Sequence, residues 1–204
     1  MGFYGDSVLP RFIDVALGTK EFDGIRARVA SNLDGEVLEV GFGSGRNVPH
    51  YPARVKRVRA IDPATVGRKL AAGRVSASSV PVEYVGLDGQ HLPLHDTSVD
   101  HVLVTWTLCT IPDVSTALDE IYRVLRPGGA LHFVEHGRSP HPRVAQWQDR
   151  LTPLWGKAFG GCHLNRSISD IVTASGLEMT HLDEYSLSGP ELFGYMFEGI
   201  ATKA

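Results

Sequence analysis

A chain of 204 residues with 43% hydrophobic residues is long enough to bury one full core, so we expect a single domain over residues 1–204. The formal net charge of -3 lacks the basic footprint of a nucleic-acid-binding protein. No apolar run approaches the roughly 18 residues of a membrane-spanning helix, and the two cysteines have no paired spacing that indicates a disulfide framework or a zinc site. We therefore expect a cytoplasmic protein with no metal, no nucleic-acid partner and no integral membrane segment.

Apolar runs alternate with helical stretches along the chain, an order that builds a parallel sheet with helices on both faces. Residues 2–30 carry aromatic and aliphatic side chains, which predict helices covering a binding site. Five strands are expected at residues 37–40, 58–61, 82–87, 101–107 and 130–135. Residues 177–185 and 193–201 would add an antiparallel edge hairpin. The predicted fold is α/β and Rossmann-like, with a seven-stranded, mostly parallel sheet.

The clearest helical pattern precedes the fifth strand. Four apolar side chains recur at helical spacing over residues 114–125, and Asp113 can cap the first turn. Residues 126–129, Arg-Pro-Gly-Gly, are expected to stop this helix and turn the chain into the next strand. A shorter helix is predicted near residues 167–175.

The most informative stretch, residues 37–45, reads Val-Leu-Glu-Val-Gly-Phe-Gly-Ser-Gly. Gly41, Gly43 and Gly45 let the chain turn sharply and bring its backbone close to a ligand. Asp62, about 20 residues past the first glycine, can accept hydrogen bonds from both hydroxyls of a ribose. Together they predict a site for a nucleoside cofactor.

Two cofactors are compatible with a glycine loop of this kind, a dinucleotide and S-adenosylmethionine. The dinucleotide pattern is G-x-G-x-x-G, whereas here the glycines alternate and Glu39 lies two residues before the first. A carboxylate there would repel a pyrophosphate but suits the ammonium or sulfonium of S-adenosylmethionine (SAM). An ionised group in a buried strand also needs a partner. Of the functions considered, a NAD-dependent dehydrogenase is the least favoured, because the glycine spacing differs and because the chain has no room for a second catalytic domain.

In an open parallel sheet, ligands bind outside the carboxyl ends of the strands. The residues expected at the cofactor site are Glu39, Gly41, Gly43, Gly45, Asn47, Asp62, Pro63, Asp88, Gly89, Gln90, Thr105 and Trp106.

These strand ends resemble the motif set of class I SAM-dependent methyltransferases of the methyltransferase domain 11 type. Residues 39–45 resemble the first motif, residues 88–93 the adenine-binding stretch and residues 124–129 the lead-in to the fifth strand. The resemblance implies that the glycines surround the methionyl part and the ribose, that Asp62 binds the ribose hydroxyls, and that Asp88 and the backbone amide of Gly89 bind adenine. It implies SAM as methyl donor and S-adenosylhomocysteine as product.

A narrower resemblance reaches beyond the cofactor motifs. Residues 105–110 (Thr-Trp-Thr-Leu-Cys-Thr), 133–136 (Phe-Val-Glu-His), 147–155 and 160–166 (Gly-Gly-Cys-His-Leu-Asn-Arg) resemble the methyltransferase-like 7 thiol methyltransferases and their bacterial relatives. This resemblance implies a small-molecule methyl acceptor, and a thiol is the leading candidate. The hydrophobic N-terminal membrane anchor of the animal members has no counterpart in this sequence. We expect residues 1–30 to form a helical cover, residues 35–136 the cofactor-binding core and residues 137–204 the substrate side.

A thiol acceptor must lose its proton, because a thiol with a pKa of about 8.5 is mainly protonated at neutral pH. His136, at the end of the fifth strand, is the first candidate base, and Glu135 or His163 is its helper or substitute. A purely structural role for His136 is equally open. Structural or pocket-lining roles are expected for Cys109 and Cys162.

The sequence also predicts roles for one charged and three aromatic side chains between residues 147 and 166. Arg166 is expected to hold a nearby carboxylate. Trp147, Trp155 and Phe159, at helical spacing, are expected in the core or in a pocket wall.

Two alternatives stay open at this stage. The acceptor could be an amine, such as a phospholipid headgroup, or the chain could be a SAM-binding regulatory protein without turnover. The sequence does not name the acceptor or the oligomeric state.

Overall fold

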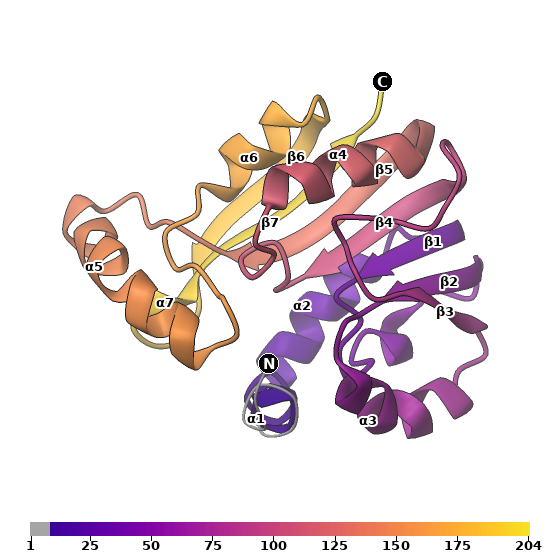
Figure 1. Ribbon diagram of the computed structural model, residues 1–204, viewed down its shortest axis with the longest axis horizontal. Helices are drawn as coiled ribbons and strands as arrows, with labels where there is room; N and C mark the ends of the chain where they lie inside the picture. The colour runs from indigo at the N-terminus through magenta and orange to yellow at the C-terminus, as the bar shows by residue number, and fades with distance from the viewer. Residues whose placement is uncertain (1–8) are drawn as a thin grey trace.

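The computed structural model describes residues 9–204, which are built around one seven-stranded sheet (Figure 1). The strands are β1 (Gly35–Val40), β2 (Val55–Ile61), β3 (Val82–Gly86), β4 (Val99–Thr105), β5 (Leu125–His136), β6 (Glu178–Ser186) and β7 (Tyr195–Thr202). Their order is β3-β2-β1-β4-β5-β7-β6. The first five are parallel, and β7 runs antiparallel to both β5 and β6. The predicted fold class and edge hairpin are confirmed.

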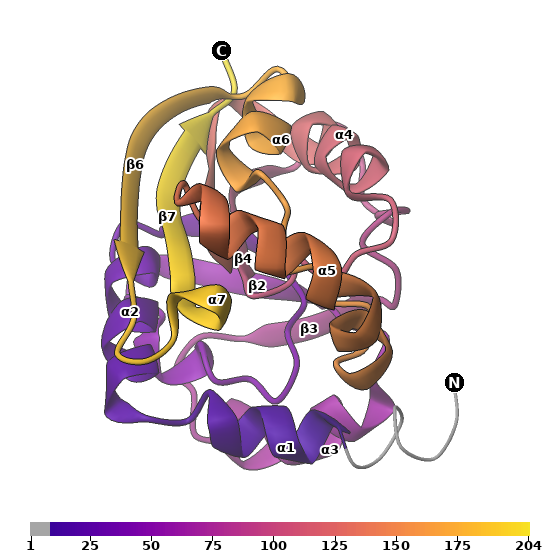
Figure 2. The same cartoon turned by 90° about the vertical axis from the view of Figure 1, so that its left-hand side faces the viewer.

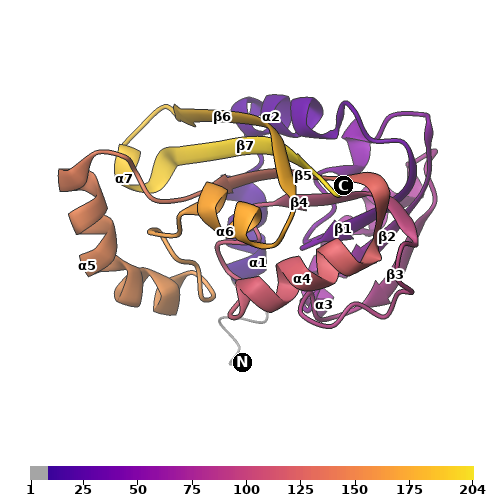
Figure 3. The ribbon, with the colours of Figure 1, turned by 90° about the horizontal axis from the view of Figure 1, so that it is seen from above.

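Helices cover both faces of the sheet. They are α1 (Leu9–Ala16), α2 (Lys20–Ala30), the 3-10 turn η2 (Val48–His50), α3 (Thr65–Ser76), α4 (Val114–Val124), α5 (Pro142–Ala158), α6 (Ile168–Ala174) and α7 (Glu191–Gly194). One hydrophobic core joins the sheet to α4 and α6, and a second joins it to α2 and α3. Figure 3 shows α2 on one side of the sheet and α4 and α6 on the other.

The central strands are apolar on both faces, as a parallel sheet covered by helices requires. Strand β1 pairs with β2 on one side and with β4 on the other. Val102, Leu103 and Val104 of β4 are buried and alternate between the two cores. This arrangement brings the carboxyl ends of β1, β2 and β4 to one edge of the sheet, where the predicted site residues follow the strands.

Helix α4 begins as predicted, with the Asp113 side chain accepting a hydrogen bond from the backbone N–H of Thr116 at 3.1 Å. The helix ends at Val124, just before residues 126–129, as predicted, and the chain passes directly into β5, which includes these four residues. They have no register partner in β4, and Gly128 has a φ of +78°. The backbone N–H of Gly128 donates to the Lys203 carbonyl, and the Lys203 N–H donates to the Gly129 carbonyl. Pairing with the C-terminal segment, which is remote in sequence, therefore holds these residues in the sheet.

The proline-rich segment after β5 forms the 17-residue helix α5, to which the sequence pattern assigned no boundaries. Pro142 occupies the first turn, where a helix does not need the missing N–H. The predicted N-terminal helices are present as α1 and α2 over the described part, whereas residues 2–8 of that prediction lie outside the described residues. Within residues 9–204, no helix combines the length and apolar character that crossing a membrane demands.

Candidate active site

The glycine loop after β1 has the backbone that its residues predict. Gly41, Gly43 and Gly45 all have positive φ, at 83°, 53° and 72°. A Cβ atom on Gly41 would collide with the side chain of Thr107, whereas a Cβ on Gly43 would find no atom closer than the Gly41 carbonyl oxygen at 3.9 Å. The loop is thus packed at Gly41 and open at Gly43, which leaves room for a ligand against the backbone.

Asp62 lies directly beneath this loop at the end of β2. Its Oδ2 atom accepts a hydrogen bond from the backbone N–H of Gly43 at 2.6 Å, and its Oδ1 atom accepts one from Ala64 at 2.7 Å. The side chain is only 6% exposed, and burial raises the pKa of Asp62. The carboxylate therefore fixes the loop, and its remaining lone pairs are free for donors. The neighbouring Pro63 is exposed.

Glu39 has the partners that a buried acid requires. Its Oε1 atom accepts a hydrogen bond from Asn47 Nδ2 at 3.0 Å, and its Oε2 atom accepts one from the Tyr51 hydroxyl. Burial raises the pKa of Glu39 to about 7. Asn47 Nδ2 also donates to Thr105 Oγ1 at 3.0 Å. Glu39 is only 1% exposed, so its carboxylate offers no surface for direct contact and is linked to its surroundings through Asn47 and Tyr51.

The strand end after β3 carries Asp88, Gly89 and Gln90. Asp88 has a half-exposed side chain that accepts a hydrogen bond from the backbone N–H of Gln90 at 2.8 Å, and this bond is the main cause that lowers the pKa of Asp88. A Cβ atom on Gly89 would lie 2.8 Å from Val40 Cγ1, so the glycine allows this loop to pack on the end of β1. The three residues thus flank the glycine loop.

Trp106, directly after β4, is in a strained conformation. Its φ of +51° is one that a bulky side chain rarely adopts, and such outliers are concentrated at functional sites. Its ring lies 5.1 Å from that of Phe22 and 4.8 Å from the Arg26 guanidinium, both from α2. Burial lowers the pKa of Arg26 to about 10. Helix α2 therefore covers the start of the segment after β4.

Several buried polar atoms around these residues have no hydrogen-bond partner within the described part of the chain. They include Asn47 Oδ1, Trp106 Nε1 and Arg26 Nε. Unsatisfied buried donors and acceptors are costly, so each one in a native protein calls for an explanation, such as strain, catalysis or a bound water or ion. Asn47 contacts Thr105 and Arg26 contacts Trp106, so the three atoms lie around the end of β4.

Helix α1 is tied to the glycine loop by one acid. Asp14 accepts hydrogen bonds from Ser44 Oγ at 2.6 Å and from Arg46 Nε at 2.8 Å, and it lies 3.4 Å from Arg74 of α3. Burial opposes ionisation of Asp14, but these bonds and cations lower its pKa. Figure 2 shows α1 running alongside α3. The helix thus lies next to the glycine loop.

Glu135 is fully buried at the end of β5. Its carboxylate accepts hydrogen bonds from the backbone N–H groups of Thr107, Leu108 and Cys109, at 2.6, 2.9 and 3.2 Å. Burial is the largest cause that raises the pKa of Glu135. With 0% exposure, Glu135 is placed to hold the turn after β4 and not to receive a proton from an acceptor.

The imidazole of His136 lies close to both cysteines of the chain. Its Nε2 atom lies 2.8 Å from Cys162 Sγ, which in turn lies 3.8 Å from Cys109 Sγ. Burial lowers the pKa of His136, but the bond to Cys162 and the nearby charges outweigh it, so the net shift is upward. The contact with Cys109, followed by burial, raises the pKa of Cys162. The sequence missed this cluster because its members have no motif spacing.

His163 lies beside the cluster. Its Nδ1 atom is 3.3 Å from the carbonyl oxygen of Cys109, which also accepts from the His163 backbone N–H at 2.8 Å. Arg166 does not hold a carboxylate as expected, since it donates to the backbone carbonyls of Leu108, Ile111 and Pro112. This prediction was wrong because unpaired carbonyls of the turn after β4 reach the guanidinium first.

The three aromatic residues predicted for the core or a pocket wall differ in their surroundings. The rings of Trp155 and Phe159 stack at 3.9 Å, and that of Phe193 stacks on Trp155 at 4.6 Å. Trp147 is instead 56% exposed, with the Arg150 guanidinium over its ring. Its helix face points away from the sheet, which periodicity alone did not reveal.

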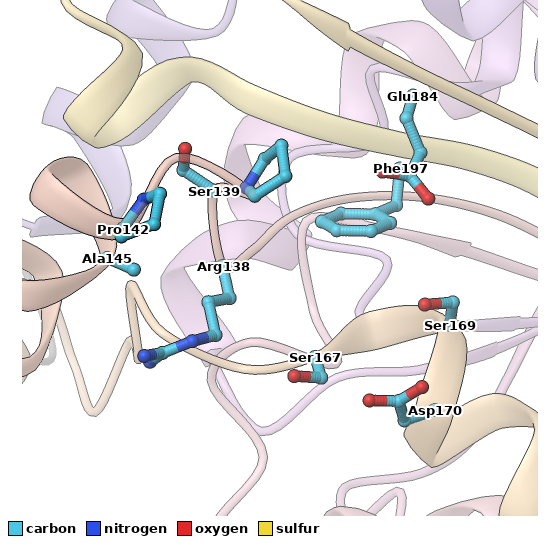
Figure 4. A pocket seen from close by; sticks show the side chains of 10 residues that line it. Arg138, Ser139, Pro142, Ala145, Ser167, Ser169, Asp170, Glu184 and Phe197 are labelled. Atoms are coloured by element: carbon cyan, nitrogen blue, oxygen red, sulfur yellow. The ribbon is translucent and has the colours of Figure 1, made fainter.

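A separate cavity of about 420 Å³ lies on the C-terminal side of the molecule (Figure 4). Its lining includes Arg138, Asp170, Glu184 and Phe197, and none of the predicted site residues. The side chains in Figure 4 come from the segment after β5, from α5, from α6 and the residue before it, and from the edge hairpin. The cavity therefore does not form part of the cofactor edge.

Comparisons with known proteins agree with this geometry. Residues 38–133 match the model of a family described as methyltransferase domain. The chain is 30% identical over 202 residues to human thiol S-methyltransferase TMT1A, covering 94% of this chain and 80% of that protein. It is 33% identical over 150 residues to rat thiol S-methyltransferase TMT1B, covering 71% of this chain but only 61% of that protein.

A solved structure extends the comparison to the fold. A SAM-dependent methyltransferase from Thermotoga maritima, named as a possible histamine N-methyltransferase, has a TM-score of 0.69 with 21% identity, covering 98% of this chain and 100% of that chain. At this identity the similarity concerns the fold alone.

Proposed function

The chain belongs to the SAM-dependent methyltransferases that carry this methyltransferase domain, and on that basis we propose that it methylates the sulfur atom of a small thiol. The observation that carries the proposal is the position of His136. It lies at the carboxyl end of β5, beside the turn after β4, at the edge of the sheet where ligands of this architecture bind. The two relatives named as thiol S-methyltransferases support the choice of acceptor.

The residues at the sheet edge fit SAM. We propose that the open backbone at Gly43 receives the nucleoside side and that Asp62 accepts hydrogen bonds from the ribose hydroxyls. Asp88 and the backbone N–H of Gly89 are assigned to adenine. When bound, SAM supplies a methyl group on a positively charged sulfonium.

The unpartnered atoms suit the other end of the cofactor. Asn47 Oδ1 is an acceptor available to an ammonium group, and Trp106 Nε1 is a donor available to a carboxylate. Burial raises the pKa of Glu39 to about 7, and a nearby cation favours its ionised form, so a bound sulfonium or ammonium would draw negative charge onto Glu39, which is bonded to Asn47. Gly41, Gly45, Thr105, Pro63 and Gln90 shape the surrounding walls.

The chemistry required of the protein is alignment, exclusion of water and removal of one proton. The acceptor R–SH loses its proton, its sulfur forms the new S–C bond, and the sulfonium S–C bond breaks. The products are the methyl thioether, S-adenosylhomocysteine and one proton. We propose that deprotonation occurs at His136, with His163 as the neighbouring imidazole and Glu135 positioning the turn after β4.

The test is transfer of a labelled methyl group from SAM to a panel of acceptors: a small alkyl thiol, a primary amine, a phenol and vesicles containing phosphatidylethanolamine. We expect label in the thiol. Label in the amine or the phospholipid instead would select N-methylation. Binding of S-adenosylhomocysteine without label in any acceptor would select a regulatory SAM-binding protein.

A further inference from the structure

Three soft donor atoms converge beside the cofactor edge. Cys109 Sγ, His136 Nε2 and Cys162 Sγ all lie within 4.8 Å of one another. They come from the turn after β4, the end of β5 and the loop after α5. Both cysteines are buried and free. Chain segments that are far apart in sequence thus deliver two thiols and one imidazole to a single point.

We propose that Cys109, His136 and Cys162 bind one zinc ion. Thiolate and imidazole are the ligands that zinc prefers, and a set of three protein ligands leaves the fourth tetrahedral position open, as in catalytic zinc sites. Among the described residues, no fourth Cys, His, Asp or Glu completes the set. The structure thus assigns an open site and not a closed structural one.

The spacing of the donors agrees with this assignment. Two sulfur atoms bound tetrahedrally at about 2.3 Å from zinc are separated by about 3.8 Å. The two Sγ atoms lie 3.8 Å apart. A nitrogen and a sulfur on the same ion are separated by about 3.6 Å, so His136 Nε2 must move back from its 2.8 Å contact with Cys162. Moving this one imidazole changes its distance to both sulfur atoms, of which Cys109 Sγ lies within 4.8 Å of Nε2.

The surroundings suit thiolates. Trp155 Nε1 donates toward Cys162 Sγ at 3.4 Å, the kind of outer contact that orients metal ligands. The Cys109 backbone N–H is held by Glu135, and the Arg166 guanidinium is bonded to Leu108, the residue before Cys109. This half-buried cation next to the turn offsets part of the negative charge that two thiolates bring.

The role of the ion rests on the proposed function, whereas its binding does not. With zinc at the cluster, the open position takes the acceptor sulfur, whose S–H proton then passes to solvent because coordination strongly acidifies a thiol. The sulfur electron pair forms the new S–C bond as the sulfonium S–C bond breaks. His136 is then a metal ligand, and the ion takes over the deprotonation.

Metal content provides the first test. The purified protein is kept reduced, stripped with a chelator, reloaded with zinc and desalted, and its zinc is measured by mass spectrometry. We expect about one zinc per chain in the wild type and in His95→Ala, a control in an exposed loop. Cys109→Ser, Cys162→Ser and His136→Ala should retain at least tenfold less. A wild type without zinc, or cysteine variants with full zinc, would overturn the proposal.

Cobalt(II) provides a second test that needs no variant. Loaded into the wild type, it should show the intense visible bands of a tetrahedral site and thiolate-to-cobalt charge transfer, which only Cys109 and Cys162 can supply because the chain has two cysteines. A weak octahedral spectrum without charge transfer would overturn the site. This measurement decides the question even where a serine variant fails to fold.

Activity then separates the two proposals. Full thiol methylation by the zinc-stripped enzyme would overturn the role of the ion and leave the proposed function intact. Bound zinc without any thiol methylation would overturn the proposed function and leave the metal site intact.

Discussion

The Nε2 atom of His136 lies 2.8 Å from the Sγ atom of Cys162. The first residue ends β5 and the second follows α5, so this contact joins the C-terminal region to the edge of the sheet at which the cofactor residues lie. Because an imidazole and a thiol in contact share their protons, neither titrates as an isolated group. The chemistry of the acceptor side therefore depends on the pair, and the first prediction follows from it.

Replacing His136 by alanine should lower thiol methylation at pH 7 by roughly 10²–10⁴-fold, because the acceptor loses the group that promotes its deprotonation. Part of the lost methylation rate should be recovered at alkaline pH, where the thiolate forms unaided. Rates from pH 6 to pH 10 measure both effects. His95→Ala is the control. Normal turnover at pH 7 would remove His136 from the chemistry, and a loss that persists at every pH would give it a structural role.

Asp62→Ala should weaken binding of both SAM and S-adenosylhomocysteine by roughly 10²-fold or more. Two ribose hydrogen bonds to a carboxylate are lost, each worth roughly 1.5–3 kcal/mol. Since Asp62 also holds the backbone N–H groups of Gly43 and Ala64, Asp62→Asn should be intermediate. Calorimetry gives the affinities, with Asp119→Ala on the exposed face of α4 as control. Unchanged affinity in a folded Asp62→Ala protein would contradict the assignment.

Asp14→Asn should weaken cofactor binding by roughly tenfold, without preventing folding. The substitution removes the charge that ties α1 to Ser44, Arg46 and Arg74, so the helix no longer holds the glycine loop closed. Because α1 would then admit water, turnover should fall further than affinity. Calorimetry and steady-state rates measure the two effects. If both stay at wild-type values, α1 contributes packing only.

Glu39 should make the fold less stable as the pH rises. Its pKa is about 7 in the folded protein against an ordinary value of 4.5, because burial disfavours the carboxylate. Between these values the folded state keeps a proton that the unfolded chain releases, so stability present below pH 4.5 is lost as the pH rises through about 7. The full loss is about 3 kcal/mol.

Glu39→Gln should remove this dependence, since the amide keeps the shape and does not titrate. Urea unfolding at intervals from pH 5 to pH 8 measures it, and Glu178→Gln on the exposed edge of β6 is the control. Equal pH dependence in Glu39→Gln and the wild type would show that Glu39 is not the group responsible.

The strand positions, the glycine loop and the acids at the strand ends were predictable, because each depends on local chemistry. Apolar runs of strand length specify the buried strands, and Gly41 needs a positive φ and a close approach that no side chain permits. Asp62 and Asp88 follow apolar runs directly, so the fold places them at the ligand edge. The parallel core could therefore be read from the order of the residues.

Other features were decided only by tertiary packing. The inclusion of residues 126–129 in β5 could not be predicted, because their partner Lys203 is remote in sequence. The residues that Glu135 holds, and the carbonyls that Arg166 reaches, likewise come from other elements of the chain.

The cysteine and histidine cluster shows the same limit most clearly. The sequence alone determined that this protein has a SAM-type glycine loop with a ribose acid, because backbone conformation and strand-end position are local properties. Only the tertiary structure brought Cys109 and Cys162 to His136, because α5 and the loop after it fold back onto the end of β5. The spacing of residues along the sequence does not predict a contact among three separate segments, because that contact depends on how the intervening helices pack.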